Sequence, residues 1–99
     1  MAVCIWDEAK RESNLEKHGI DFVDAATIFE DRFRLERTDG RRDYGEARIQ
    51  ATGFGQGKLM FVVYTRRGDL RRLISARLAN RNERQRYEEE KKTAPRKPY

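Results

Sequence analysis

The chain has 99 residues, of which 39% are charged and 37% hydrophobic, and its formal net charge at pH 7 is +5. This length allows one domain with a single modest core. One cysteine and one histidine exclude an intramolecular disulfide and a zinc site built from these residue types. The sequence has no signal peptide and no apolar run that could span a bilayer, so we expect a cytoplasmic protein. Its basic charge balance is typical of proteins that bind a polyanion or an acidic partner.

The chain begins with a short β-favouring run at residues 3–6, which we expect to form an edge strand. A helix is predicted over residues 7–19, because Asp7 is a good N-cap and Gly19 stands where a left-handed residue ends a helix. At about 100° per residue, three glutamates fall on one side of this helix. The residues on roughly the opposite side are Lys10, Asn14, Lys17 and His18.

A second helix is predicted to follow at once. Asp21 caps it, and apolar residues recur at helical spacing from Phe22 to Phe29. This is the best amphipathic pattern in the chain, so we assign the helix to the core and give it no role in chemistry.

After residue 30 the apolar period changes to two, which predicts a meander of four antiparallel strands. The first strand contains Phe33 and Leu35. The third, at residues 59–64, is apolar on both faces and is therefore expected at the centre of the sheet. Polar or glycine-containing turns, of which the first is expected to be mobile, are predicted at residues 38–43, 55–57 and 67–69.

Alternation along the second strand of the meander places four polar residues on one face, namely Tyr44, Glu46, Arg48 and Gln50. Ser75 and Arg77 share a face of the fourth strand, and the sequence leaves open whether the two faces are the same. Residues 80–83 then form a capping-box pattern that predicts a last helix up to Lys92. Helices segregated from an antiparallel sheet define an α+β fold.

Motifs spread along the chain resemble those of the BrnT toxins. They are Trp6-Asp7, Lys10, Asn14, Lys17-His18-Gly19, Phe22, Ala25-Ala26, Phe29, Gly45-Glu46-x-Arg48, Val63-Tyr64-Thr65, Ile74-Ser75-Ala76-Arg77, Glu83 and Tyr87. The resemblance implies a toxin domain over residues 1–90 and leaves residues 91–99 as a flexible tail. It implies a RelE-like fold, in which two N-terminal helices and a C-terminal helix pack with an antiparallel sheet of four to five strands.

The resemblance also implies a function. The chain would be the toxin of a type II toxin–antitoxin module, an endoribonuclease that cleaves RNA without a metal or other cofactor and inhibits translation. A BrnA antitoxin with a ribbon-helix-helix would neutralise it in a hetero-oligomer, and the complex would bind operator DNA and repress its own operon. Two alternatives stay open, a non-catalytic nucleic-acid-binding module and a module that only docks an antitoxin.

Metal-free RNA cleavage needs a base, an acid and cations that stabilise the charge on the phosphorane. His18 has an ordinary pKa suited to either proton transfer, and Glu46 is an alternative base. Arginine forks bind phosphate in a bidentate manner, and tyrosines can stack on bases or donate hydrogen bonds. The candidate catalytic residues are His18, Glu46, Arg48 and Arg77. The candidate RNA-binding residues are Lys10, Asn14, Lys17, Tyr64, Arg66 and Tyr87.

Each candidate also has a structural interpretation. His18 can interact favourably with the C-terminal end of its helix dipole. Glu46 and Arg48 can form an ion pair, Glu83 can cap the last helix, and Arg77 can bridge the sheet to that helix. The helix residues Lys10, Asn14 and Lys17 can hydrogen-bond loop carbonyls.

Overall fold

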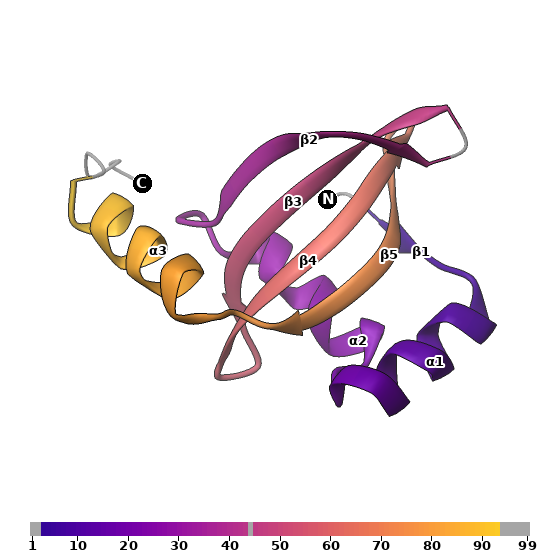
Figure 1. Ribbon diagram of the computed structural model, residues 1–99, viewed down its shortest axis with the longest axis horizontal. Coiled ribbons are helices and arrows are strands. Elements are labelled where there is room, and N and C mark those ends of the chain that lie inside the picture. The colour runs from indigo at the N-terminus through magenta and orange to yellow at the C-terminus, as the bar shows by residue number, and fades with distance from the viewer. Residues whose placement is uncertain (1–2, 44, 94–99) are drawn as a thin grey trace.

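A computed structural model describes residues 3–43 and 45–93 (Figure 1). It contains a five-stranded sheet in the order β1-β5-β4-β3-β2. The strands are β1 (Cys4–Ile5), β2 (Leu35–Asp43), β3 (Glu46–Gly55), β4 (Lys58–Arg67) and β5 (Leu70–Leu78). The helices are α1 (Glu8–His18), α2 (Phe22–Ala25), the 3-10 helix η1 (Ala26–Glu30) and α3 (Arg81–Thr93). The α+β class is confirmed, and the strand that is apolar on both faces is central.

The sheet is mixed, which corrects the prediction that all of its strands are antiparallel. The pairs β2–β3, β3–β4 and β4–β5 are antiparallel, whereas the edge strand β1 pairs with β5 in parallel. Antiparallel neighbours can be joined by a tight hairpin, but parallel neighbours need a longer crossover. The chain leaves β1 into α1 and α2 rather than into a hairpin, so the connection permits parallel pairing.

The second predicted helix is α-helical only from Phe22 to Ala25, and the chain continues from Ala26 to Glu30 as the 3-10 helix η1. The hydroxyl of Thr27 donates a hydrogen bond of 2.6 Å to the carbonyl of Asp24, a local bond that competes with regular helix geometry. The end of β3 also approaches η1 closely, because a Cβ atom at Gly55 would lie 2.2 Å from the hydroxyl of Thr27. Only glycine fits this crossing of strand and helix.

Residues 38–43, predicted as a turn, belong to β2. The pairing of β2 with β3 is regular up to Thr38 opposite Ile49 and resumes at Arg42 opposite Ala47, so a bulge absorbs the extra residues. Phe33, predicted in this strand, lies before it in a turn where its N–H donates to the carboxylate of Asp31 (2.9 Å). Residues 38–43 are mostly charged or polar, so their composition predicts a turn, but pairing with β3 makes them a strand.

The turns at residues 55–57 and 67–69 are confirmed. The backbone of Gln56 and Gly57 has positive φ angles of 51° and 73°, as the two-residue turns of tight hairpins require. The capping box is also confirmed, since the N–H of Glu83 donates to Asn80 Oδ1 (2.8 Å) and the N–H of Asn80 donates to Glu83 Oε1 (2.9 Å).

The core lies between one face of the sheet and the helices α1, α2 and η1. Phe22, Ala25 and Ile28 from the helical segments are fully buried against Met60, Val62 and other strand residues. In Figure 1 the sheet lies in front of the helical segment formed by α2 and η1, so the opposite face of the sheet is turned to the viewer. We call that opposite side the open face.

Helix α3 extends away from the sheet at one end (Figure 1). It is attached through Tyr87, which is 4% exposed and whose hydroxyl donates to Asp31 Oδ2 (2.6 Å). The helix continues to Thr93, so it includes the first residues of the predicted tail, and residues 94–99 of that tail lie outside the described residues. No helix in the described part of the chain is long and apolar enough to cross a membrane.

Candidate functional site

The strand register places the two polar rows predicted from the sequence on the same face. Gln50 of β3 pairs with Val63 of β4, which in turn pairs with Ser75 of β5. Residues directly opposite one another in neighbouring strands point to the same side of a sheet. The polar side chains of β3, including Glu46 and Arg48, therefore share the open face with Ser75 and Arg77. Tyr44, predicted in the same row, lies outside the described residues.

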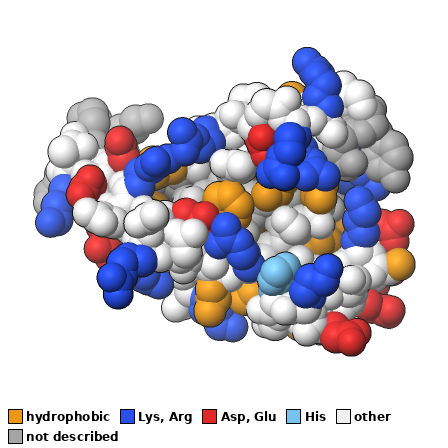
Figure 2. Space-filling view, in the orientation of Figure 1, with side chains coloured by type: hydrophobic (Ala, Val, Ile, Leu, Met, Phe, Trp, Pro, Cys, Tyr) orange, Lys and Arg blue, Asp and Glu red, His pale blue; other side chains and the backbone are white. Residues whose placement is uncertain are grey.

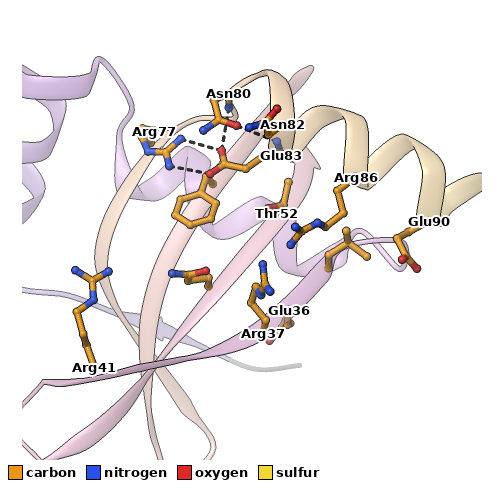
Figure 3. Close-up of a pocket in the computed structure, with 13 residues that line it drawn as sticks. Glu36, Arg37, Arg41, Thr52, Arg77, Asn80, Asn82, Glu83, Arg86 and Glu90 are labelled. Carbon is orange, nitrogen blue, oxygen red and sulfur yellow. Dashed lines mark hydrogen bonds and ion pairs between the residues drawn. The ribbon is translucent and has the colours of Figure 1, made fainter.

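A groove of about 790 Å³ lies between the open face and α3 (Figure 3). Its cationic side chains come from three elements that are distant in the sequence. They are Arg37 and Arg41 of β2, Arg77 of β5 and Arg86 of α3. Side-chain amides and an aromatic ring complete much of the wall, from Gln50, Asn80, Asn82 and Phe61. Figure 2 shows basic side chains on both sides of this hollow, with hydrophobic side chains between them.

Arg77 is fixed by several contacts. Its Nη1 and Nη2 donate to the two carboxylate oxygens of Glu83 at 2.9 and 2.8 Å, and its guanidinium lies 4.3 Å from the centre of the Phe61 ring. Burial raises the pKa of Glu83, but the hydrogen bonds from Arg77 and Asn80 outweigh it and leave that pKa below its ordinary value. The structural role anticipated for Arg77, a bridge from sheet to helix, is therefore observed.

The other arginines of the groove differ in how far they are neutralised. Arg41 forms an ion pair of 2.8 Å with Asp39, and its hydrogen bonds lower the pKa of Asp39 to about 2. Arg37 makes no hydrogen bond or ion pair with any residue in the described ranges, and Arg86 acts on Glu83 through space. In Figure 3 the side chains of Arg37 and Arg86 extend toward one another across the groove. Two arginines are thus available to an anion in the groove.

Glu46 and Arg48 lie on the open face but do not line the groove. Glu46 Oε1 is 3.4 Å from Nε of Arg67, so Glu46 forms an ion pair with that arginine. Arg48 precedes Ile49, and Ile49 pairs with Tyr64. In an antiparallel pair Arg48 therefore lies opposite Thr65. Thr65 is fully buried and pairs with Arg72, so both arginines flank it on this face.

Asn14 is a buried structural residue. It is 7% exposed, and its Nδ2 donates to the carbonyls of Ile20 (2.9 Å) and Ala76 (2.8 Å). The N–H of Ala76 donates back to Asn14 Oδ1 (3.0 Å). The side-chain amide thus pairs with the edge of β5 as a peptide unit would, and it ties α1 to the sheet.

The other α1 candidates are at the surface or near it. Lys17 and His18 are exposed, and Lys10 is half-buried. His18 follows Asn14 by four residues, so it lies on the same side of the helix. The histidine, pale blue in Figure 2, is on the side of the molecule that carries the open face, although it does not line the groove.

The two tyrosines and Arg66 lie away from the groove. Tyr64 is fully buried under η1, with its ring 5.1 Å from that of Phe29 and its hydroxyl donating to Glu36. Burial and that hydrogen bond raise the pKa of Tyr64. Tyr87 is buried where α3 docks, and Arg66 is exposed with its guanidinium 5.9 Å from the centre of the Tyr64 ring.

Of the ten predicted site residues, the structure places Arg77 in the groove and Glu46 and Arg48 on the same face. Sequence reasoning missed Arg37, Arg41 and Arg86. Arg37 shares a face of β2 with the apolar Leu35, so alternation alone would have assigned it to the core side, and only its pairing with Gln50 places it on the open face. No local signal marks Arg86, because the docking of α3 turns it toward the sheet. No group of three or more His, Cys, Asp or Glu residues that could hold a metal occurs in residues 3–43 and 45–93.

A basic α+β domain with an arginine-lined groove is typical of small proteins that bind nucleic acids. Comparison with known families narrows this class. Residues 6–83 match the family described as the ribonuclease toxin BrnT of type II toxin–antitoxin systems, and the chain therefore belongs to that family. The resemblance drawn from the sequence motifs is confirmed. No curated protein matches the sequence.

Proposed function

We propose that this ribonuclease toxin binds RNA in the groove between the open face and α3 and cleaves it, without a metal ion, where the bound strand continues over the open face. The observation that carries the proposal is the convergence of Arg37, Arg41, Arg77 and Arg86 from three separate elements on one cavity. A phosphodiester chain supplies the anions that such a set of guanidinium groups binds. The cavity volume suits one or two nucleotides of an unpaired strand rather than a duplex.

Phosphate binding falls first to Arg37 and Arg86, which make no ion pair or hydrogen bond with any residue that the structure describes. Arg37 and Arg86 approach the groove from opposite walls, so a backbone passing between them contacts both (Figure 3). The guanidinium of Arg77 lies over the ring of Phe61 and both line the groove, where an unpaired base can stack on them. Lys10, Lys17 and Arg66 extend the basic surface, whereas Asn14, Tyr64 and Tyr87 act by holding α1, β4 and α3 in place.

The chemical step needs a proton acceptor for the ribose 2′-hydroxyl and a proton donor for the departing 5′-oxygen. Attack of the 2′-oxygen on phosphorus breaks the bond to the 5′-oxygen and leaves a 2′,3′-cyclic phosphate. His18 and Glu46 are the candidates for the two proton transfers. Arg48 and Arg77 stabilise the charge on the phosphorane. Because Glu83 already holds Arg77, a phosphate must share or displace that carboxylate.

On the basis of the family, the proposal also covers the role of the protein in the cell. The toxin is cytoplasmic, inhibits translation by cutting RNA, and is neutralised by a BrnA antitoxin with a ribbon-helix-helix. Their hetero-oligomer binds operator DNA and represses the operon. The helices and sheet would then correspond to a RelE-like arrangement with an added parallel edge strand.

The proposal is tested by cleavage of a fluorescent single-stranded RNA in EDTA, with the wild type and single variants. His18→Ala and Glu46→Gln should each slow cleavage by about 10²-fold or more, the usual contribution of a positioned acid or base. RNA affinity should change little, and the circular dichroism spectrum should not change. Cleavage that needs a divalent ion would contradict the metal-free mechanism. Equal rates in all variants would reject the residue assignments.

A second candidate, RNA binding without cleavage, is favoured by the pairing of Arg77 with Glu83 and by the position of His18 outside the groove lining. It predicts salt-dependent binding with no products in the same assay. Expression with and without the neighbouring gene separates the two in cells, since growth arrest with RNA fragmentation supports the nuclease.

A further inference from the structure

A second cavity, of about 430 Å³, lies on the helix-covered side of the sheet between β1 and η1. Its walls are largely apolar and include Trp6, Val23, Ala26 and Phe29. Val23, which lines the cavity, is unusually exposed for an apolar residue, at 52%. An apolar patch that continues into a cavity is typical of a binding surface.

The buried residue of this cavity is a cation. Arg71 is only 7% exposed, and its Nε is buried without a hydrogen-bond partner in the described ranges. Its guanidinium lies 4.2 Å from the centre of the Phe29 ring, and Glu36 acts on it through space. A buried donor without an acceptor is unfavourable, and a carboxylate oxygen is the acceptor that satisfies an arginine best. The Arg71 side chain also hydrogen-bonds the side chain of Tyr64, so only its Nε lacks a partner in the described part of the chain. The cavity therefore combines apolar walls with a buried cation that has one donor still to satisfy.

We propose that this cavity docks a segment of a protein partner that inserts an apolar side chain between Trp6 and Phe29 and places a neighbouring carboxylate on Arg71. Charge complementarity supports this occupant, because the buried charge at the site is positive. The one acidic lining residue, Glu30, is exposed, so water screens it. A toxin–antitoxin family also provides a protein partner.

The site is separate from the groove, which is on the opposite face of the sheet. The proposal therefore depends on the family but not on RNA cleavage in the groove. A partner bound only here would leave the groove open, so its effect on activity would come from other segments of the same partner.

The chain supplies two reporters for this site, since Trp6 is its only tryptophan and Cys4 its only cysteine, and both line the cavity. We would titrate the full chain with a blocked peptide that contains Leu followed by Glu in an Ala/Ser background. Binding should change Trp6 fluorescence and protect Cys4 from alkylation. Replacing Glu by Gln or Leu by Ser in the peptide should each weaken binding about tenfold.

Two protein variants locate the binding. Arg71→Met should weaken peptide binding by a similar factor. Val23→Glu should also weaken peptide binding, and because Val23 is exposed, the fold should tolerate this change. Val23→Glu keeps the test valid if Arg71→Met does not fold. Neither RNA cleavage nor RNA affinity should change in Val23→Glu, which separates this proposal from the one about the groove.

Three outcomes would overturn the proposal. The first is no response of either reporter at millimolar peptide. The second is equal affinity for the Glu and Gln peptides. The third is tighter binding of hexanoate, a free apolar carboxylate, than of the peptide, which would make the cavity a small-molecule site.

Discussion

Arg77 and Glu83 are joined by two parallel hydrogen bonds of 2.9 and 2.8 Å, and this pair links the end of β5 to the first turn of α3. Glu83 also accepts the N–H of Asn80, so one carboxylate caps the helix and orients an arginine in the groove. The position of the groove's α3 wall, which carries Arg86, therefore depends on this carboxylate.

Replacing Glu83 with Gln should lower the free energy of unfolding by about 1–2 kcal/mol, since it weakens a helix cap and a partly exposed ion pair. The pKa of Glu83 lies below its ordinary value of 4.5 in the folded state. Its contribution is therefore present above pH 4.5 and is lost as the pH falls through the folded pKa. Urea titrations should show a smaller loss of stability on acidification for the variant. The same loss in both proteins would contradict this role.

Asn14→Ala should lower the free energy of unfolding by about 3 kcal/mol, because it leaves buried groups of Ile20 and Ala76 without partners. Asn14→Asp should also destabilise, since a carboxylate would face both carbonyls. The exposed neighbour Ser13 provides the control, and Ser13→Ala should stay within about 0.5 kcal/mol. A direct RNA contact by Asn14 would appear instead as lost RNA affinity at unchanged stability.

Arg37→Gln should weaken binding of a non-cleavable 2′-O-methyl RNA, because Arg37 lines the groove and forms no ion pair with the described part of the chain. The slope of log affinity against log salt should fall by about 0.7, the value for one phosphate contact on a single strand. Lys58→Gln is the matched control, as Lys58 is exposed in β4 and does not line the groove. Fluorescence anisotropy at several salt concentrations measures the RNA affinity and its salt dependence for each variant. Equal slopes for the two variants would place the RNA elsewhere.

Tyr64→Phe should reduce stability by about 1–2 kcal/mol through the lost hydrogen bond to Glu36 and leave RNA affinity unchanged. The pKa of Tyr64 is raised above its ordinary value of 10.0, mainly by burial. Its stabilising effect is thus complete below pH 10 and is lost as the pH rises through the folded pKa. The wild type should lose more stability than the variant above pH 10 in chemical denaturation. If a folded Tyr64→Phe protein binds RNA more weakly than the wild type, the structural role is contradicted and Tyr64 contacts RNA as the sequence predicted.

The features predicted correctly from the sequence are those fixed by neighbouring residues. The turn at Gly55-Gln56-Gly57 needs positive φ angles, and the capping box at residues 80–83 needs side chains three positions apart. Residues 38–43 were misassigned because the pairing that makes them a strand comes from β3. Asn14 was a candidate RNA contact with a structural alternative, and the sequence could not identify its partner in β5, Ala76, because that residue is 62 positions away.

The candidate site shows the same limit. The family and the basic surface could be predicted, but the groove is formed by β2, β5 and α3, whose relative positions no local pattern specifies. Arg86 and Arg37 meet across it only in the folded chain. Alternation did place Glu46, Arg48 and Arg77 on polar strand faces, and the register showed these to be one face.

The most direct test of RNA binding in the groove is an NMR titration of the ¹⁵N-labelled chain with a non-cleavable single-stranded 2′-O-methyl RNA. If the account is correct, amide shifts will concentrate at groove residues such as Arg37, Gln50 and Arg86, and the α2 and η1 amides around Val23 and Ala26 will stay unchanged. Shifts that concentrate on α2 and η1 and spare the groove would contradict the account.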